Sequence, residues 1–452
     1  MDGMKINQAK LDMFETMPIP KAVLKNAVPS MIGMLMMLLY NLADTFFIAQ
    51  TKDDLQVAAV SLAMPVFMIF MGFGTLFGAG GASVISRSLG AGRREYAMKV
   101  SAFCMWACVI TGVLLAIVLW VFMTPLLKVM GASAETEPFT RSYLTVVAAC
   151  GPMAVFSGGF QSIIRSEGQA TSAMTGVLVG NIVSIVLNPL MILTMGLGIT
   201  GVAISTVIGN IVSAAIYLLH FFRRKSSLSI SPRLFTVKDK VLRNVMAIGV
   251  PAALGHLLMS ISAAFANGLM SGYGDMAVAA LGVSIKLSMI IGTMCVGLAQ
   301  GAQPLLGYSV GAGNWKRYKG IFKFSITCAL ALSATITCLC YLFTGEIVGV
   351  FLTGGDAFSL GVSFARIIMS TGALFGVFYL ISNSIQSIGS AIPTFIISIS
   401  RQGIVYIPSL FILNVTVGMN GMVWAQPVAD VLSTVLAIVL YTIVLRRRMS
   451  AT

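Results

Sequence analysis

Long apolar stretches separated by short polar ones extend over almost the whole chain. A helix needs about 20 mostly apolar residues to cross the hydrocarbon core of a bilayer. The pattern predicts twelve such helices, at residues 26–49, 57–86, 99–123, 141–164, 172–195, 199–222, 246–271, 278–309, 320–344, 362–387, 393–414 and 420–445. The two-residue alternation of a transmembrane strand is absent from the sequence, which therefore indicates an all-α membrane protein.

The second half of the chain repeats the first. Residues 58–92 align with residues 279–313 at an offset of 221, with nine identities in 35 positions and the same Gly-Ala-Gly ending. Pro29 in the first predicted helix matches Pro251 in the seventh. Membrane helices share a Leu-, Ala- and Gly-rich composition that produces chance matches, but separate matches in the same order along the chain indicate a duplication.

An even number of helices in each half keeps both halves in the same orientation across the membrane. The axis that relates them then runs along the membrane normal, as in secondary transporters whose binding site lies between two parallel repeats. The sequence predicts an N-terminal six-helix lobe at residues 26–222 and a C-terminal six-helix lobe at residues 246–445, related by a pseudo-two-fold axis. Three polar segments complete the chain, at residues 1–25, 223–245 and 446–452.

Basic residues set the expected orientation in the membrane. The termini and the loops on their side hold 23 basic residues, whereas the loops on the opposite side hold three. Because positively charged loops stay in the cytoplasm, we expect the N-terminal segment, the basic linker 223–245 and the C-terminal tail to be cytoplasmic, in a protein of the inner (plasma) membrane. Most of the net charge of +14 reflects this asymmetry, and its scatter over short loops argues against nucleic-acid binding.

Acidic residues are rare inside the predicted helices, where only Asp44 and Asp430 lie far from the ends. A charge within a bilayer costs at least about 2.5–3.5 kcal/mol on insertion scales, so both acids are functional candidates. The first-half candidates, which follow helical spacing, are Asn41, Asp44, Asn181, Ser184, Asn188, Thr206 and Asn210. Taken singly, such amides and hydroxyls often bond between membrane helices, but a carboxylate among them suits a small hard cation or a proton. We therefore predict a cation- or proton-binding site here.

The second half is built differently, because the position aligned with Asp44 is Ala266. Its candidates form a predicted polar network in the C-terminal lobe, consisting of Asp430, Arg401, Lys286, Gln426 and His256. Buried charges in membranes pair, so we expect Asp430 beside Arg401 or Lys286, with Arg401 favoured because its helix directly precedes that of Asp430. Such a pair either sets helix register or acts as a latch that breaks during transport, and the sequence leaves both roles open.

Enzyme-type constellations are missing from the sequence. The seven cysteines lie in apolar stretches at spacings that match no metal site. His256 is expected to be a hydrogen-bonded core residue, with a proton relay as the alternative. The Gly-rich stretches lack the Lys-Ser/Thr of a nucleotide-binding loop. We therefore expect no catalytic residue, no metal site and no cofactor other than the coupling ion.

Four stretches carry a recognisable pattern. They are Tyr40-Asn-Leu-Ala-Asp-Thr-Phe-Phe-Ile48, Gly78-Ala-Gly-Gly-Ala-Ser83, Gly297-Leu-Ala-Gln-Gly-Ala-Gln-Pro304 and Gly421-Met-Val-Trp-Ala-Gln-Pro-Val-Ala-Asp430. Through them and the helix spacing, the chain resembles the multidrug and toxic-compound extrusion (MATE) family, in its bacterial MepA-like/DinF-like branch. The resemblance covers essentially the whole chain and implies a cation- or proton-coupled exporter with two six-helix lobes.

The resemblance also implies roles for single residues. Asp44 corresponds to the carboxylate that binds Na⁺ or H⁺ in the N-terminal lobe, and Thr206 to a hydroxyl at that site. The family commonly has Asp before the proline of the fifth helix and Asn four residues earlier, where this chain has Asn188 and Ser184. Because the site loses one charge, the departure favours protons, or a weakened ion site, over two-carboxylate Na⁺ binding.

We therefore predict an antiporter, driven by H⁺ or Na⁺, that exports small amphipathic organic compounds by alternating access. The alternative is a lipid-linked oligosaccharide flippase of the same superfamily, which should carry more cavity cations than Lys286 and Arg401. An intramembrane enzyme lacks its nucleophile or metal, and a channel would need a ring of equivalent pore residues. The expected partners are organic substrates and the lipid bilayer, with the protein acting as a monomer.

Overall fold

The computed structural model describes residues 12–50, 53–223, 226–352 and 354–450. Within these ranges the regular structure is helical throughout, so the predicted all-α membrane fold is confirmed. Ten helices are long and apolar enough to cross a membrane, and two bent helix pairs raise the number to twelve if each pair is one span. Every predicted transmembrane stretch therefore has its helix or helix pair.

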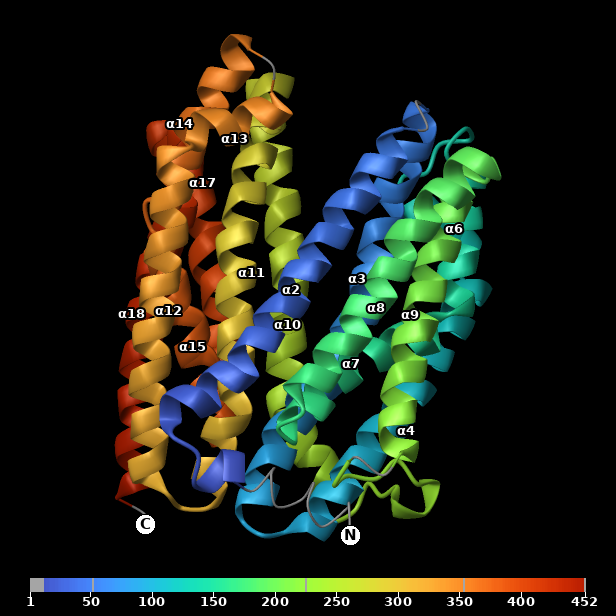
Figure 1. The fold of residues 1–452 in the computed structure, drawn as a ribbon. Helices are drawn as coiled ribbons and strands as arrows, with labels where there is room; N and C mark the ends of the chain where they lie inside the picture. Colours follow the sequence, from blue (N-terminus) through green and yellow to red (C-terminus); the bar gives the residue numbers. More distant parts are fainter. Residues whose placement is uncertain (1–11, 51–52, 224–225, 353, 451–452) are drawn as a thin grey trace. The chain divides into compact units, whose positions relative to one another are not determined.

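The helices of the first half follow each other without long connections (Figure 1). They are α2 (Ile19–Ala49), α3 (Asp54–Gly90), α4 (Arg94–Val121), α5 (Met123–Val129), α6 (Glu137–Ala149), α7 (Gly151–Ser166), α8 (Ala170–Pro189), the π-helical η1 (Leu190–Thr194) and α9 (Gly198–Phe222). The 3₁₀ turn η2 (Pro232–Leu234) lies in the linker that follows.

The second half repeats this order. Its elements are α10 (Val241–Met270), the 3₁₀ turn η3 (Ser271–Tyr273), α11 (Asp275–Gly311), α12 (Trp315–Leu342), α13 (Thr344–Phe351), α14 (Gly355–Met369), α15 (Gly372–Ile388), α16 (Ala391–Ile399), the π-helical η4 (Ser400–Tyr406), α17 (Ile407–Val417) and α18 (Met419–Met449). The repeated Gly-Ala-Gly sequence adopts the same turn in both halves, with φ of +70° at Gly92 and +68° at Gly313. This left-handed conformation favours glycine and ends α3 and α11.

Two predicted helices are bent rather than straight. The stretch 141–164 is the pair α6 and α7, which meet at 58°, and the stretch 362–387 is the pair α14 and α15, which meet at 44°. In the first pair, Pro152 follows the break and cannot donate a backbone hydrogen bond to the preceding turn. The two breaks occupy equivalent places in the two halves.

A π-helical segment interrupts the predicted helix 393–414. The segment η4 carries Arg401 and is followed by Pro408 in the first turn of α17. Because proline has no backbone N–H, the helix cannot keep its regular ladder here. Single π-helical turns inside longer helices are frequent at functional sites, and this one turns Arg401 into the protein.

The chain divides into two compact units. Unit 1 comprises residues 32–253 and the segment that ends at Met17, and unit 2 comprises residues 18–31 and the chain from Leu254 onward. The division therefore runs through α2 and α10, shortly after Pro29 and Pro251. The first turns of α2 belong to unit 2, whereas the first turns of α10 belong to unit 1.

Close helix crossings hold these exchanged segments within their units. In unit 1, Gly80 of α3 lies against the backbone of Val245 of α10, and in unit 2, Gly301 of α11 lies against Ala27 of α2. The two glycines are equivalent in the repeat. A methyl group at either position would overlap the crossing helix, so glycine lets the two backbones approach each other.

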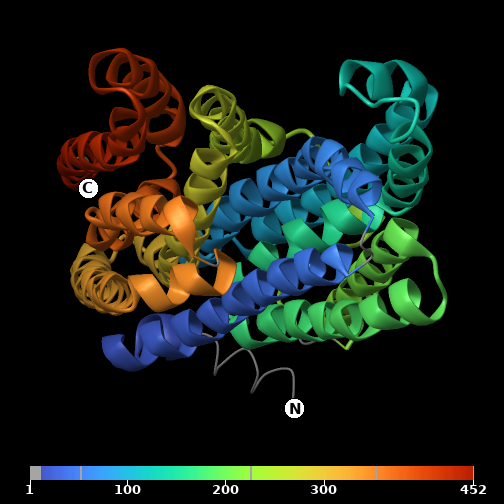
Figure 2. The ribbon, with the colours of Figure 1, turned by 90° about the horizontal axis from the view of Figure 1, so that it is seen from above.

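Each unit has its own apolar interior. In unit 1, a large cluster of buried side chains includes Phe70, Phe103 and Phe160. Within that unit, α8 and α9 lie side by side, as both views show (Figure 1, Figure 2). Within unit 2, α17 and α18 are paired in the same way.

Candidate functional site

The first candidate site, which we call the Asp44 site, joins three helices of unit 1. Asp44 of α2 accepts a hydrogen bond of 3.2 Å at Oδ1 from the side-chain amide of Asn188, near the end of α8. The Oδ1 of Asn188 in turn accepts a hydrogen bond from the hydroxyl of Ser205 in α9. Asn188 and Ser205 are completely buried, whereas Asp44 is half-buried. The carboxylate therefore lies at the open end of a buried polar chain.

A second polar contact lies one turn away along α2. The hydroxyls of Tyr40 and Thr206 are hydrogen-bonded at 2.7 Å, and either can donate. The amide of Asn210 donates to the backbone carbonyl of Thr206 at 3.0 Å and accepts at Oδ1 from Ser157 of α7 at 2.8 Å. This second branch connects α2, α7 and α9 beside the Asp44 site.

The other predicted first-half residues do not reach Asp44. Asn41 is exposed and donates to the carbonyl of Met37 in its own helix. The buried Nδ2 atom of Asn181 has no hydrogen-bond partner among the described residues. Ser184 donates to the backbone carbonyl of Ser205, so it braces α9 rather than the carboxylate. Of the seven predicted residues, the structure brings Asn188 into direct contact with Asp44.

Three polar residues of this region were not expected from the sequence. Tyr40 lies four residues before Asp44, a spacing that places it on the same face of α2. Ser205 directly precedes the predicted Thr206, and Ser157 lies in α7. Serines in membrane helices commonly bond to their own backbone, so their sequence context did not single them out. Ser205 and Ser157 were identified only through the partners that the fold brings to them.

The chemistry of the Asp44 site follows from its single charge. The carboxylate has one hydrogen bond in the described structure, donated by a neutral amide, and its Oδ2 is left available. Across the described residues, no group of three or more His, Cys, Asp or Glu side chains could hold a metal ion together. A lone carboxylate with neutral oxygen donors fits a proton or a weakly held monovalent cation better than a divalent ion.

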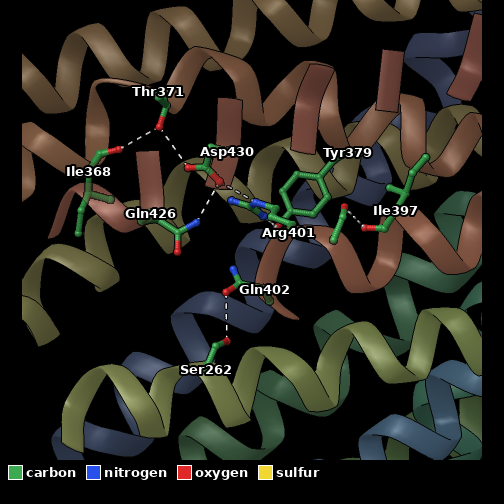
Figure 3. A network of polar contacts seen from close by, with 10 residues as sticks. Ser262, Ile368, Thr371, Tyr379, Ile397, Arg401, Gln402, Gln426 and Asp430 are labelled. Atoms are coloured by element: carbon green, nitrogen blue, oxygen red, sulfur yellow. Dashed lines mark hydrogen bonds and ion pairs between the residues drawn. The ribbon is translucent and has the colours of Figure 1, made fainter. Parts of the chain in front are cut away.

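The second candidate site is the Arg401–Asp430 network of unit 2, made up of Arg401, Asp430, Gln426, Thr371 and Tyr379 (Figure 3). Nε of Arg401 donates to Oδ1 of Asp430 at 2.7 Å, and its Nη1 donates to the hydroxyl of Tyr379, also at 2.7 Å. Asp430 accepts two further hydrogen bonds, from Gln426 at 2.9 Å and from Thr371 at 3.1 Å. Both oxygens of the buried carboxylate therefore accept hydrogen bonds.

Aromatic rings surround the arginine. The guanidinium carbon of Arg401 lies 4.6 Å from the ring centre of Phe375 and 5.2 Å from those of Phe378 and Tyr379. Such contacts stabilise a desolvated cation through the negative face of the ring. Rings and carboxylate together compensate a charge that has been withdrawn from water.

Two predicted members lie outside this network. The ammonium of Lys286 lies 5.1 Å from the ring centre of Phe351 and contacts no carboxylate in the described residues. His256 has an exposed side chain that makes no hydrogen bond within the same part of the chain. Thr371 and Tyr379 were missed instead, because Thr371 lies at the bend between α14 and α15, which the sequence pattern presented as one helix.

Comparisons with known proteins complete this picture. A family model described as MatE matches residues 29–190 and 251–412. The multidrug export protein MepA of Staphylococcus aureus (strain MSSA476) is 30% identical over 443 residues, which cover 98% of this chain and 97% of the relative. MepA of Staphylococcus saprophyticus is 29% identical over 442 residues, with the same coverage.

Solved structures are similar over the same length. A crystal structure of MATE in complex with MaL6 has a TM-score of 0.91 at 26% identity and covers 97% of this chain and 98% of its own. An outward-facing conformation of a multidrug resistance MATE family transporter of the MOP superfamily has a TM-score of 0.89 at 26% identity, with 96% of both chains covered. The two-lobe fold of these proteins is therefore also the fold of the present chain.

Proposed function

The chain belongs to the MatE family, and on that premise we propose that it exports amphipathic organic compounds in exchange for H⁺ or Na⁺. It is a multi-pass membrane transporter and not an enzyme. The observation that carries the coupling proposal is the contact between Asp44 and Asn188 within unit 1. A half-buried carboxylate with one neutral donor gains a favourable partner when it takes up a positive ion.

The composition of the Asp44 site favours the proton as the coupling ion. A Na⁺ site usually offers several oxygen ligands with more than one negative charge, whereas here the second carboxylate of the family pattern is replaced by Asn188. The amide lowers the charge of the site without changing its size. In this proposal, ion uptake at Asp44 on one side of the membrane and its release on the other are linked to substrate export by alternating access.

The basic loops support an orientation with both termini in the cytoplasm of a bacterial cell. We propose a monomer, because each chain holds both units and both candidate sites. The lipid-linked oligosaccharide flippase is not favoured, since the relatives are multidrug export proteins. Moreover, Asp430 neutralises Arg401 and leaves little positive charge for a pyrophosphate group.

The proposal is tested with the purified protein in liposomes, loaded with a fluorescent organic cation. Transport is measured with a pH gradient alone and with a Na⁺ gradient alone, for the parent and for Asp44→Asn. We expect gradient-driven transport to fall at least about tenfold in Asp44→Asn, because the amide cannot cycle a proton. The exposed Asp356 at the start of α14 provides the matched control, Asp356→Asn, which should transport normally. Undiminished gradient-driven transport by a well-folded Asp44→Asn protein would contradict the proposal.

A further inference from the structure

The side chain of Asn188 is held at both ends by groups of different character. Its Nδ2 faces the carboxylate of Asp44, which only accepts when it is charged, and its Oδ1 faces the hydroxyl of Ser205, which donates and accepts. Since Asn188 and Ser205 are completely buried, water does not compensate for a lost partner. The hydrogen-bond balance of these three residues therefore constrains which states the Asp44 site can adopt.

When Asp44 is charged and holds no cation, the arrangement seen in the structure satisfies the hydrogen bonds of these three residues. The amide N–H of Asn188 donates to the carboxylate, and the single hydroxyl hydrogen of Ser205 donates to the amide oxygen. Both ends of the Asn188 amide therefore have a hydrogen-bond partner, and the carboxylate receives a donor.

When Asp44 takes up a cation, it favours an acceptor rather than a donor from the Asn188 side chain. A protonated Asp44 has an O–H to donate, and a Na⁺ ion at Asp44 seeks oxygen ligands, so either one favours the carbonyl oxygen of Asn188 over its N–H. A half-turn of the amide about χ2 supplies that oxygen and directs the N–H toward Ser205. The hydroxyl then has to accept, which requires another acceptor for its own hydrogen.

Ser205 already has such acceptors. Its Oγ lies 3.0 Å from the carbonyl oxygen of Gly201 and 2.9 Å from that of Val202, both in the preceding turn of α9. The hydroxyl can therefore move its hydrogen from Asn188 to its own helix by rotation about one bond. Neither the backbone nor the position of the Asn188 side chain has to change.

We propose that Asn188 and Ser205 form an amide-rotation relay that responds to the occupancy of Asp44 by its coupling cation, with Ser205 as a positioning residue. The relay rests on the proposed function, because it requires Asp44 to take up and release a cation. The relay explains what the amide contributes. A carboxylate at position 188 has no N–H, so rotation about χ2 could not provide a donor for the empty Asp44 and an acceptor for the cation-bound Asp44.

Among the side chains near Asp44, Asn188 is the one that responds directly to the uptake of a cation. The charge of Asp44 acts on two titratable side chains, Tyr40 on its own helix and Tyr143 on α6. The hydroxyl of Tyr40 is bonded to Thr206. In the described residues, α8 presents the neutral Asn188 to the carboxylate and α9 presents Ser205 to Asn188, and no basic side chain acts on Asp44 in competition with the cation.

Removal of the Ser205 hydroxyl should weaken the cation-bound state more than the empty one. In Ser205→Ala the empty state leaves a carbonyl oxygen without a donor, whereas the occupied state leaves an N–H without an acceptor. Buried N–H groups without a partner are the rarer of the two in proteins. We expect the cation concentration for half-occupancy of Asp44 to rise about tenfold, because an unsatisfied buried N–H costs more free energy than an unsatisfied carbonyl oxygen.

Ser213 gives a matched control on the same helix. It is also a buried serine of α9 and donates across to α8, to the carbonyl oxygen of Gly176 at 2.9 Å, two turns away from Ser205. Ser213→Ala removes an equal group from the same helix pair without touching Asn188. Any general loosening of α8 against α9 should therefore show in both variants.

The experiment follows two infrared bands of the reconstituted, isotope-labelled protein. The Asp44 carboxylate band is assigned by its loss in Asp44→Asn, and the Asn188 amide band by its loss in Asn188→Leu. One titration varies pH without Na⁺, and the other varies Na⁺ at high pH, which separates the two coupling cations. We expect both bands to change with the same midpoint in the parent and in Ser213→Ala, and at about tenfold higher cation concentration in Ser205→Ala.

Two results would overturn the relay alone: an Asp44 band that titrates while the Asn188 band stays constant, or an unchanged midpoint in Ser205→Ala. If Ser205→Ala does not fold, the two bands of the parent still decide, since the relay demands that they move together. An Asp44 band that responds to neither cation would remove the proposed function and the relay with it.

Discussion

Arg401 and Asp430 form a buried ion pair, with 2.7 Å between Nε and Oδ1 and with 11% and 1% of their side chains exposed. The pair joins the π-helical segment η4 to α18. Thr371, at the bend between α14 and α15, also donates a hydrogen bond to Asp430. The segment η4, the helix α18 and the bend between α14 and α15 therefore meet at the carboxylate of Asp430.

We predict that Asp430→Ala lowers the thermal stability of the protein strongly. Loss of one partner leaves a buried cation uncompensated, which costs about 3–5 kcal/mol. Combination with Arg401→Leu should restore part of the loss, which a thermal-shift series on the single and double variants measures. Additive losses would show that the two charges do not depend on each other. Normal stability with loss of transport would instead indicate a latch that acts during transport.

Tyr379→Phe tests the second partner of the arginine. The variant keeps the ring beside the guanidinium and removes the hydroxyl that accepts from Nη1. Hydrogen bonds to charged groups contribute about 1.5–3 kcal/mol, so the unfolding temperature should fall measurably, but less than in Asp430→Ala. Tyr341→Phe is the control, because that exposed ring lies beside Arg366 and its hydroxyl donates no hydrogen bond to, and accepts none from, this arginine in the described structure. Equal unfolding temperatures for both variants would contradict a role of the Tyr379 hydroxyl.

Asn188→Asp should shift ion preference toward Na⁺. A carboxylate oxygen in place of the amide nitrogen would lie 3.2 Å from Oδ1 of Asp44, where two like charges require a cation between them or a proton on one of them. Transport at fixed pH with and without Na⁺ measures the effect, and a larger stimulation by Na⁺ than in the parent is expected. Asn414→Asp, at the end of α17, adds a similar charge outside the Asp44 site and should leave the stimulation unchanged. If Asn188→Asp responds to Na⁺ as the parent does, residue 188 does not contribute to the cation site.

Gly80→Ala should disrupt the crossing of α3 with α10. Its methyl group would meet the backbone of Val245, which cannot rotate away, so a loss of about 1–3 kcal/mol or more is expected from overpacking. Gly72→Ala on the same helix is the control, since nothing lies within 4 Å of the added methyl there. That substitution should be neutral or slightly stabilising, because alanine favours helices by about 0.5–1 kcal/mol over glycine. Thermal unfolding of the two variants in detergent compares them, and an equal effect would argue against the close crossing.

The hydrophobic pattern by itself determined the membrane fold and the positions of the helices. These features depend on local composition, because a stretch that is apolar for a bilayer's width has to form a helix whatever lies next to it. The rarity of Asp44 and Asp430 within such stretches was equally local information. Their cost in a membrane marks them without knowledge of their neighbours.

The tertiary structure alone decided which side chains meet these acids. The sequence left Arg401 and Lys286 as partners for Asp430, and the fold places Arg401 there because η4 turns its side chain into unit 2. Ser205, Thr371 and Tyr379 carried no distinguishing pattern of their own. Their roles follow from a bend, a π-helical turn and the pairing of α8 with α9, where the backbone departs from regular helical spacing or where two distant segments face each other. Helical periodicity predicts the face of one helix, but the contact between two faces is a property of the folded chain.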